Sequence, residues 1–122
     1  MAGSKVTVVA SESVPKNEYP GGAWSRLLIT NASVEGNRST LGHSHFPPGA
    51  ATDPIVHEIE EVCLVTSGRG ELRTDSGDYP FAAGDAIHIP AGVWHSVVNG
   101  GEEPVTMVFG FPHPEYPPTR RK

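Results

Sequence analysis

The stretch that decides the fold is GDAIHIPAGVWHSVVN, residues 84–99. Two short segments with β-strand composition, DAIHI and VWHSVV, lie on either side of a Pro-Ala-Gly turn, and the turn-forming run NGGEEP follows the second. Proline fixes φ and lacks a backbone donor, and glycine tolerates positive φ, so both residues interrupt a strand and favour a turn. The stretch therefore predicts two β-strands separated by a tight turn, with His95 on the second strand.

The same alternation of short strands and turns continues in both directions along the chain. Segments such as WSRLLIT, EEVCLVT and VTMVFGF are separated by runs rich in Gly, Pro, Asn and Asp. No window shows sustained helical periodicity, and these turns recur about every ten residues. The spacing predicts an all-β sandwich or barrel.

One domain is expected, because 122 residues is a common length for a single hydrophobic core. We expect an N-terminal arm and the loop behind it at residues 1–22, a barrel at residues 23–112 and a proline-rich tail at residues 113–122. The valines of the arm could add a strand to this subunit or to a partner. The tail cannot form a central strand, because proline has no N–H to donate, so we expect it to be extended.

Composition and charge exclude several classes of protein. The net charge is −5, from nine basic and 14 acidic residues, which argues against a nucleic-acid-binding protein. No apolar run approaches the roughly 20 residues that span a bilayer, and the first residues do not resemble a signal peptide. The single cysteine, Cys63, cannot form an internal disulfide. We therefore expect a cytoplasmic protein without nucleic-acid or membrane partners.

The chain has six histidines, and their spacing points to a site. His43 and His45 are two residues apart and share one face if their segment is a strand. His57 precedes Glu61 by four residues across the start of a predicted strand, where a corner can turn both side chains inward. His95 lies on a different predicted strand.

Residues 84–99 resemble the second motif of the cupin superfamily at every defining position. The order is Gly84, five residues, Pro90-x-Gly92, two residues, His95, three residues and Asn99. Such a complete match in spacing makes the resemblance specific.

The first cupin motif usually reads His-x-His, three or four residues, Glu, six residues and Gly. Residues 55–68, IVHEIEEVCLVTSG, keep this order from His57 through Glu61 to Gly68, but Ile55 stands where the first histidine is expected. The preceding PPGAATDP also looks like the Pro-Gly turn that commonly leads into this motif.

The resemblance covers roughly residues 24–112 and implies a small single-domain cupin. Its fold would be a double-stranded β-helix, a jelly-roll barrel of two facing sheets. The turn spacing predicts the same all-β class independently.

Carried over residue by residue, the resemblance implies that His57, Glu61 and His95 are the ligands of one divalent transition metal. Two imidazoles and one carboxylate match the facial triad of non-haem iron oxygenases, so iron is favoured, and manganese, nickel, cobalt or zinc could also bind. Three interpretations of Ile55 stay open: a ligand simply lost, a ligand replaced by His45 or His43, or a barrel that has lost its metal.

The expected pocket-lining residues are Cys63, Trp94, Met107 and Phe109. Cys63 shares a strand face with Glu61, and Trp94 directly precedes His95. A buried free cysteine is usually a small apolar residue, so no catalytic role is assigned to Cys63.

The resemblance implies a metal-dependent enzyme acting on a small organic molecule, with dioxygenase chemistry favoured slightly. The alternatives are a redox-neutral isomerase, lyase, decarboxylase or cyclase, and a non-catalytic module that binds a small ligand. We also expect a homodimer, because open sheet edges need covering and the arm and the tail could cover them.

Overall fold

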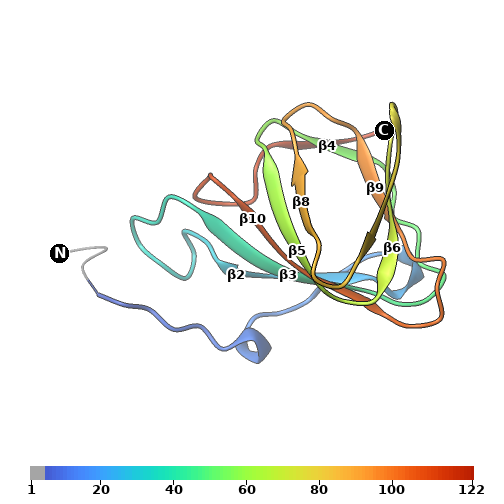
Figure 1. Ribbon diagram of the computed structural model, residues 1–122. Coiled ribbons are helices and arrows are strands. Elements are labelled where there is room, and N and C mark those ends of the chain that lie inside the picture. The colour runs from blue at the N-terminus through green and yellow to red at the C-terminus, as the bar shows by residue number, and fades with distance from the viewer. Residues whose placement is uncertain (1–4) are drawn as a thin grey trace.

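The computed structural model describes residues 5–122 and consists mainly of short β-strands (Figure 1). Two 3-10 helices, η1 (Ser11–Ser13) and η2 (Pro20–Gly22), lie near the start of the chain. The strands are β1 (Asn17–Glu18), β2 (Trp24–Ile29), β3 (Thr40–Phe46), β4 (Ile55–His57), β5 (Glu61–Ser67), β6 (Arg69–Thr74), β7 (Gly77–Ala82), β8 (Ala86–Ile89), β9 (His95–Val98), β10 (Val105–Phe111) and β11 (Thr119–Arg121). The all-β prediction is confirmed.

The strands form two antiparallel sheets that face each other as a barrel (Figure 1). The six-stranded sheet has the order β1-β2-β3-β10-β5-β8, and the five-stranded sheet has the order β11-β4-β9-β6-β7. The two segments around the Pro-Ala-Gly turn are β8 and β9, and they belong to different sheets. This turn therefore carries the chain from one wall of the barrel to the other.

Alternation along β10 shows how the interior is built. Val105, Met107, Phe109 and Phe111 are buried, and the residues between them lie on the outer face. Gly42 of β3 lies opposite Phe109, and a Cβ atom at Gly42 would be 2.2 Å from the Cζ atom of that ring. A glycine is therefore required at this position for the aromatic ring to pack against the backbone.

The tail is part of the barrel. Residues 119–121 form β11, which pairs with β4 as the edge strand of the five-stranded sheet. The backbone N–H of Glu58 also donates to the carbonyl oxygen of Pro118 at 3.1 Å. The prolines precede the strand, so they remove no donor from its ladder.

The described part of the arm, residues 5–10, forms no strand and leads away from the barrel (Figure 1). The expected strand is therefore not added to this subunit by these residues, and residues 1–4 lie outside the described part of the chain. Val6 and Val8 are 93% and 90% exposed. Between residues 5 and 122, the chain has no helix long and apolar enough to cross a membrane.

Candidate metal centre

Three strands bring His57, Glu61 and His95 together inside the barrel. His57 ends β4 and His95 begins β9 in the five-stranded sheet, whereas Glu61 begins β5 in the other sheet. Glu61 Oε1 lies 3.1 Å from His57 Nε2 and 3.6 Å from His95 Nε2. One potential ligand atom from each of the three residues lies within 4.8 Å of the others. This spacing could hold one metal ion between them.

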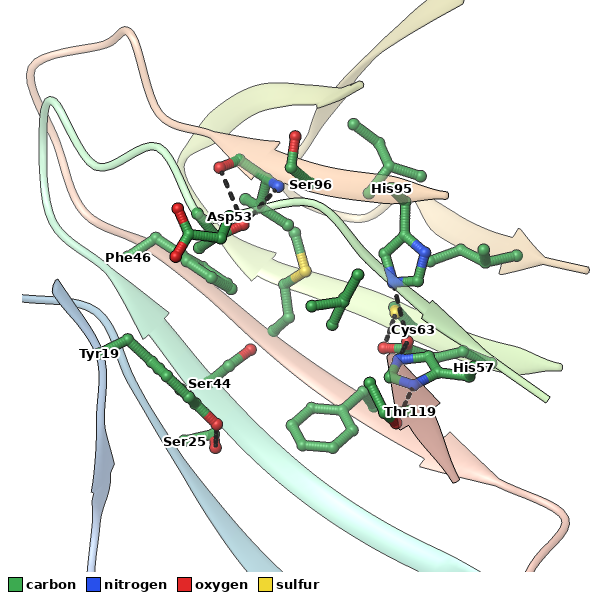
Figure 2. Close-up of a pocket in the computed structure, with 18 of the residues that line it drawn as sticks. Tyr19, Ser25, Ser44, Phe46, Asp53, His57, Cys63, His95, Ser96 and Thr119 are labelled. Carbon is green, nitrogen blue, oxygen red and sulfur yellow. Dashed lines mark hydrogen bonds and ion pairs between the residues drawn. The ribbon is translucent and has the colours of Figure 1, made fainter. Parts of the chain in front are cut away.

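The two imidazoles are buried in the barrel wall, where His57 is 4% and His95 is 5% exposed. The short bend at residues 58–60 carries the chain from β4 in one sheet to β5 in the other, and Glu61 then faces His57 from the opposite sheet. Figure 2 shows the imidazoles of His57 and His95 pointing toward each other.

The charges at the site favour a carboxylate beside two imidazoles. Burial acts to raise the pKa of Glu61, but the hydrogen bonds and charges of His57 and His95 outweigh it and lower this pKa to about 2. Burial likewise acts to lower the pKa of His95, and its hydrogen bonds to Glu61 and to the Val93 carbonyl reverse that effect, so this pKa is raised. The buried carboxylate thus needs a positive partner, which is either a proton on an imidazole or a metal ion.

Hydrogen bonds on the far side of each ring support a metal site. His95 Nδ1 lies 2.9 Å from the carbonyl oxygen of Val93, which can only accept, so Nδ1 carries a proton. Nε2 then donates to Glu61 when the ring is protonated and has a lone pair for a metal ion when the ring is neutral. His57 Nδ1 lies 2.6 Å from Thr119 Oγ1. The lone pairs of the two Nε2 atoms and of Glu61 Oε1 point toward the same place, and a cation there would accept all three. This donor set therefore fits a divalent transition metal.

Cys63 lies beside the cluster and contacts its carboxylate. Its Sγ donates to Glu61 Oε2 at 3.3 Å, the oxygen that does not face the imidazoles. Burial first, and then the charge of Glu61, raise the pKa of this thiol strongly. Cys63 therefore stays protonated and can act as a hydrogen-bond donor, not as a thiolate ligand.

A cavity of about 530 Å³ extends from the cluster through the barrel (Figure 2). Apolar side chains from both sheets, Met107 and Phe109 among them, form much of its wall. The Tyr19 hydroxyl lies 2.8 Å from Ser25 Oγ, and both residues border the cavity together with Ser44. The cavity therefore combines an apolar wall with a few polar groups, as is usual for small-molecule sites.

The prediction that Trp94 lines the pocket is wrong. The Trp94 ring lies near the charged groups of Arg120 and Lys122, with centroid distances of 5.8 and 5.5 Å, and the residue does not border the cavity. Because neighbouring side chains point to opposite faces, an inward His95 directs Trp94 away from the interior.

The suggestion that His45 or His43 replaces the ligand missing at position 55 is also wrong. Ser44 is buried in β3 and borders the cavity, so the residues on either side of it lie on the outer face. There the Trp24 ring stacks on His45 at 5.2 Å and meets His43 edge-on at the same distance.

Ile55 borders the cavity and contributes an apolar surface where the usual motif has an imidazole.

Two residues of the tail that the sequence did not point to also contact the site. The Thr119 hydroxyl forms a hydrogen bond with His57. The Tyr116 ring packs edge-on against the same imidazole, with 5.5 Å between the ring centroids. No local pattern marks either residue, because both reach the site only through the pairing of β11 with β4.

Comparisons with known proteins place the chain in a family. The model of the Cupin domain family matches residues 42–111. Protein SchB of Streptomyces halstedii is 29% identical over 110 residues, which are 89% of this chain and 79% of that protein. The polyketide synthase CurC of Streptomyces cyaneus is 30% identical over 103 residues, which are 84% of this chain and 66% of that protein.

Two solved structures show the same architecture. The polyketide cyclase RemF from Streptomyces resistomycificus superposes with a TM-score of 0.79 at 27% identity, covering 96% of this chain and 85% of that one. A predicted oxalate decarboxylase from Thermotoga maritima superposes with a TM-score of 0.73 at 22% identity, covering 85% of this chain and 96% of that one, and this likeness concerns the fold alone. Because the family match spans more than half of the chain and includes His57, Glu61 and His95, this protein belongs to the cupin family.

Proposed function

We propose that this cupin is a metal-dependent enzyme that closes a ring in an apolar, polycarbonyl molecule, as a polyketide cyclase does. The observation that carries the proposal is the His57–Glu61–His95 cluster set in the wall of a largely apolar cavity of about 530 Å³. The likeness to RemF, described as a polyketide cyclase, and to CurC, described as a polyketide synthase, supports this substrate class.

The length of the cavity suits an elongated molecule. Ser44 lies opposite Met107, and Val62 lies opposite Gly110, which puts Glu61 level with Phe111. Met107 and Phe111 are four residues apart, or about 13 Å along a strand. A substrate could therefore place one carbonyl at the metal cluster and another polar group near Ser44.

Ring closure in such a molecule needs no oxidant. A carbon between two carbonyls loses a proton and bonds to a carbonyl carbon further along the chain, whose oxygen takes up a proton. Loss of one water then completes the double bond. When bound, the divalent ion supplies Lewis-acid polarisation of a carbonyl oxygen.

The residues of this chain hold and shield that centre. His57, Glu61 and His95 are the groups that would bind the ion, and the thiol of Cys63 keeps the second carboxylate oxygen occupied. The neighbouring imidazoles lower the pKa of Glu61, which favours a ligand role for this carboxylate over proton abstraction. The apolar wall limits the water around the reacting carbonyls.

A dioxygenase is the second candidate, because the ligand set itself favours it. Two imidazoles and one carboxylate would hold an iron(II) ion, which would supply the activation of dioxygen. Non-catalytic binding of a small ligand is the outcome if neither reaction occurs.

One experiment separates these functions. Metal content is measured by mass spectrometry on untagged protein, and the loaded protein is then incubated with a synthetic linear oligo-β-ketone with and without dioxygen. A cyclase converts the ketone anaerobically to a product that has lost water, whereas a dioxygenase consumes oxygen and adds its atoms to the product. Absence of bound metal, or no conversion without dioxygen, would refute the proposed cyclase.

A further inference from the structure

We propose that Thr119 is a positioning residue that fixes the tautomer of His57 and so directs the Nε2 lone pair of this histidine toward the metal position. The inference rests on the proposed function only in naming a metal as the group that the lone pair binds. It gives the C-terminal tail a part in building the metal centre.

Several contacts hold Thr119 at its place beside the ring. Thr119 is directly opposite His57 in the β11–β4 pairing, where side chains of paired residues lie close together. Backbone hydrogen bonds on both sides of it, from Glu58 N to Pro118 O at 3.1 Å and from Lys122 N to Pro54 O at 3.3 Å, fasten the tail to the β4 region.

The direction of the hydrogen bonds at Thr119 follows from its hydroxyl group, which has only one proton to donate. Thr119 Oγ1 donates its only proton to the carbonyl oxygen of Pro117 at 2.8 Å. With that proton directed to Pro117, the same oxygen accepts in the contact of 2.6 Å with His57 Nδ1, and we infer that Nδ1 carries the ring proton. A neutral imidazole protonated at Nδ1 has a lone pair on Nε2, which is the atom 3.1 Å from Glu61 Oε1.

The alternative tautomer would weaken metal binding. If the proton were on Nε2, His57 would donate directly to Glu61 Oε1 and satisfy the carboxylate without an ion. By supplying an acceptor to Nδ1, Thr119 favours the Nδ1–H tautomer of the neutral ring, as the Val93 carbonyl does for His95. Because the Val93 acceptor belongs to the backbone, Thr119 is the site of choice for a side-chain substitution that tests the principle.

The decisive variant is Thr119→Val, which keeps the β-branched shape and removes the hydroxyl. Thr119→Ser keeps the hydroxyl and is the conservative rescue. Thr106→Val is the matched control, because this threonine also hydrogen-bonds through its hydroxyl, to Thr66 and Ser67, but on the outer face of β10. Circular dichroism and thermal unfolding establish that each variant is folded.

The first measurement needs no metal. Long-range proton–nitrogen NMR of the imidazoles in metal-free protein, in alkaline buffer, reports which nitrogen of His57 is protonated. We expect the Nδ1–H tautomer in the wild type, Thr119→Ser and Thr106→Val, and a shift toward Nε2–H in Thr119→Val. An Nε2–H tautomer in the wild type, or an unchanged Nδ1–H tautomer in Thr119→Val, would overturn the inference.

The second measurement is titration of metal-free protein with cobalt(II), followed by its visible absorption. We expect Thr119→Val to bind about 10–100-fold more weakly, the usual effect of removing an outer partner of a ligating histidine, and the other two variants to bind like the wild type. Wild-type affinity in Thr119→Val would overturn the positioning role. Failure of the wild type to bind cobalt together with the expected tautomers would refute the proposed function but uphold the control of His57 by Thr119.

Discussion

Ile55 lies directly opposite His95 in the pairing of β4 with β9, and it borders the cavity two residues before His57. An apolar side chain thus occupies the position from which an imidazole would reach the metal centre. The cluster consequently offers three potential metal ligands, with an apolar residue on its cavity side, and this arrangement leads to the first prediction.

Ile55→His should add a fourth ligand. Residues 55 and 57 share one face of β4, so the new imidazole would point to the side of the cluster. We expect tighter cobalt(II) binding and slower ring closure, because the added ligand takes a position that the substrate needs. Ile55→Asn, which offers no imidazole, is the control. Unchanged affinity in Ile55→His would show that position 55 does not face the ion.

His95→Ala should remove most of the metal affinity, because it deletes one of three ligands. We expect a loss larger than the roughly 10–100-fold effect of an outer hydrogen-bond partner, measured by cobalt(II) titration or by metal content after dialysis. His45→Ala is the matched control, since His45 stacks on Trp24 on the outer face. Full metal occupancy in His95→Ala would refute the proposed ligand set.

The pH dependence of stability should reverse when metal binds. In metal-free protein the raised pKa of His95 stabilises the fold fully below about 6.5, the ordinary histidine value, and this contribution is lost as pH rises through the raised pKa. The lowered pKa of Glu61 stabilises the fold above its ordinary value of 4.5, and this contribution is lost as pH falls toward about 2. The pair therefore stabilises metal-free protein most between about 4.5 and 6.5.

Metal binding needs an unprotonated His95, so the stabilisation by metal should instead grow as pH rises above that window. Thermal unfolding with and without added cobalt(II), across a pH series, checks both trends. Glu61→Gln should flatten the metal-free profile, and an unchanged profile in this variant would contradict the assignment.

Gly42→Ala should destabilise the barrel. The new Cβ atom would lie 2.2 Å from the Cζ atom of Phe109, so the ring must move and the core becomes overpacked. We expect a loss of about 1–3 kcal/mol in the free energy of unfolding, measured by urea denaturation. Gly100→Ala is the control, because a Cβ there meets nothing within 4 Å, and it should change stability by less than about 0.5 kcal/mol. Equal stability of the two variants would argue against close packing at Gly42.

The homodimer stays a prediction, and the arm is the place to test it. Val6 and Val8 are nearly fully exposed, and the arm forms no strand within its own subunit at residues 5–10. We expect the full chain to sediment as a dimer and a chain lacking residues 1–10 to sediment as a monomer or to aggregate. A stable monomer of the full chain would contradict the prediction.

The sequence by itself determined the fold class and the three clustered residues. Turn residues and the period of two act over a few positions, so the motifs around His57, Glu61 and His95 could be recognised without a structure.

Only the tertiary structure decided which face of each strand is inside and what the tail contacts. Alternation predicts that His43 and His45 share a face, but the interior side of β3 depends on the sheet that covers it, and both histidines lie outside. Trp94 points away from the cavity for the same reason. Thr119 and His57 are 62 positions apart in the chain, and they meet because β11 pairs with β4. Local sequence preferences do not specify which distant strands pair.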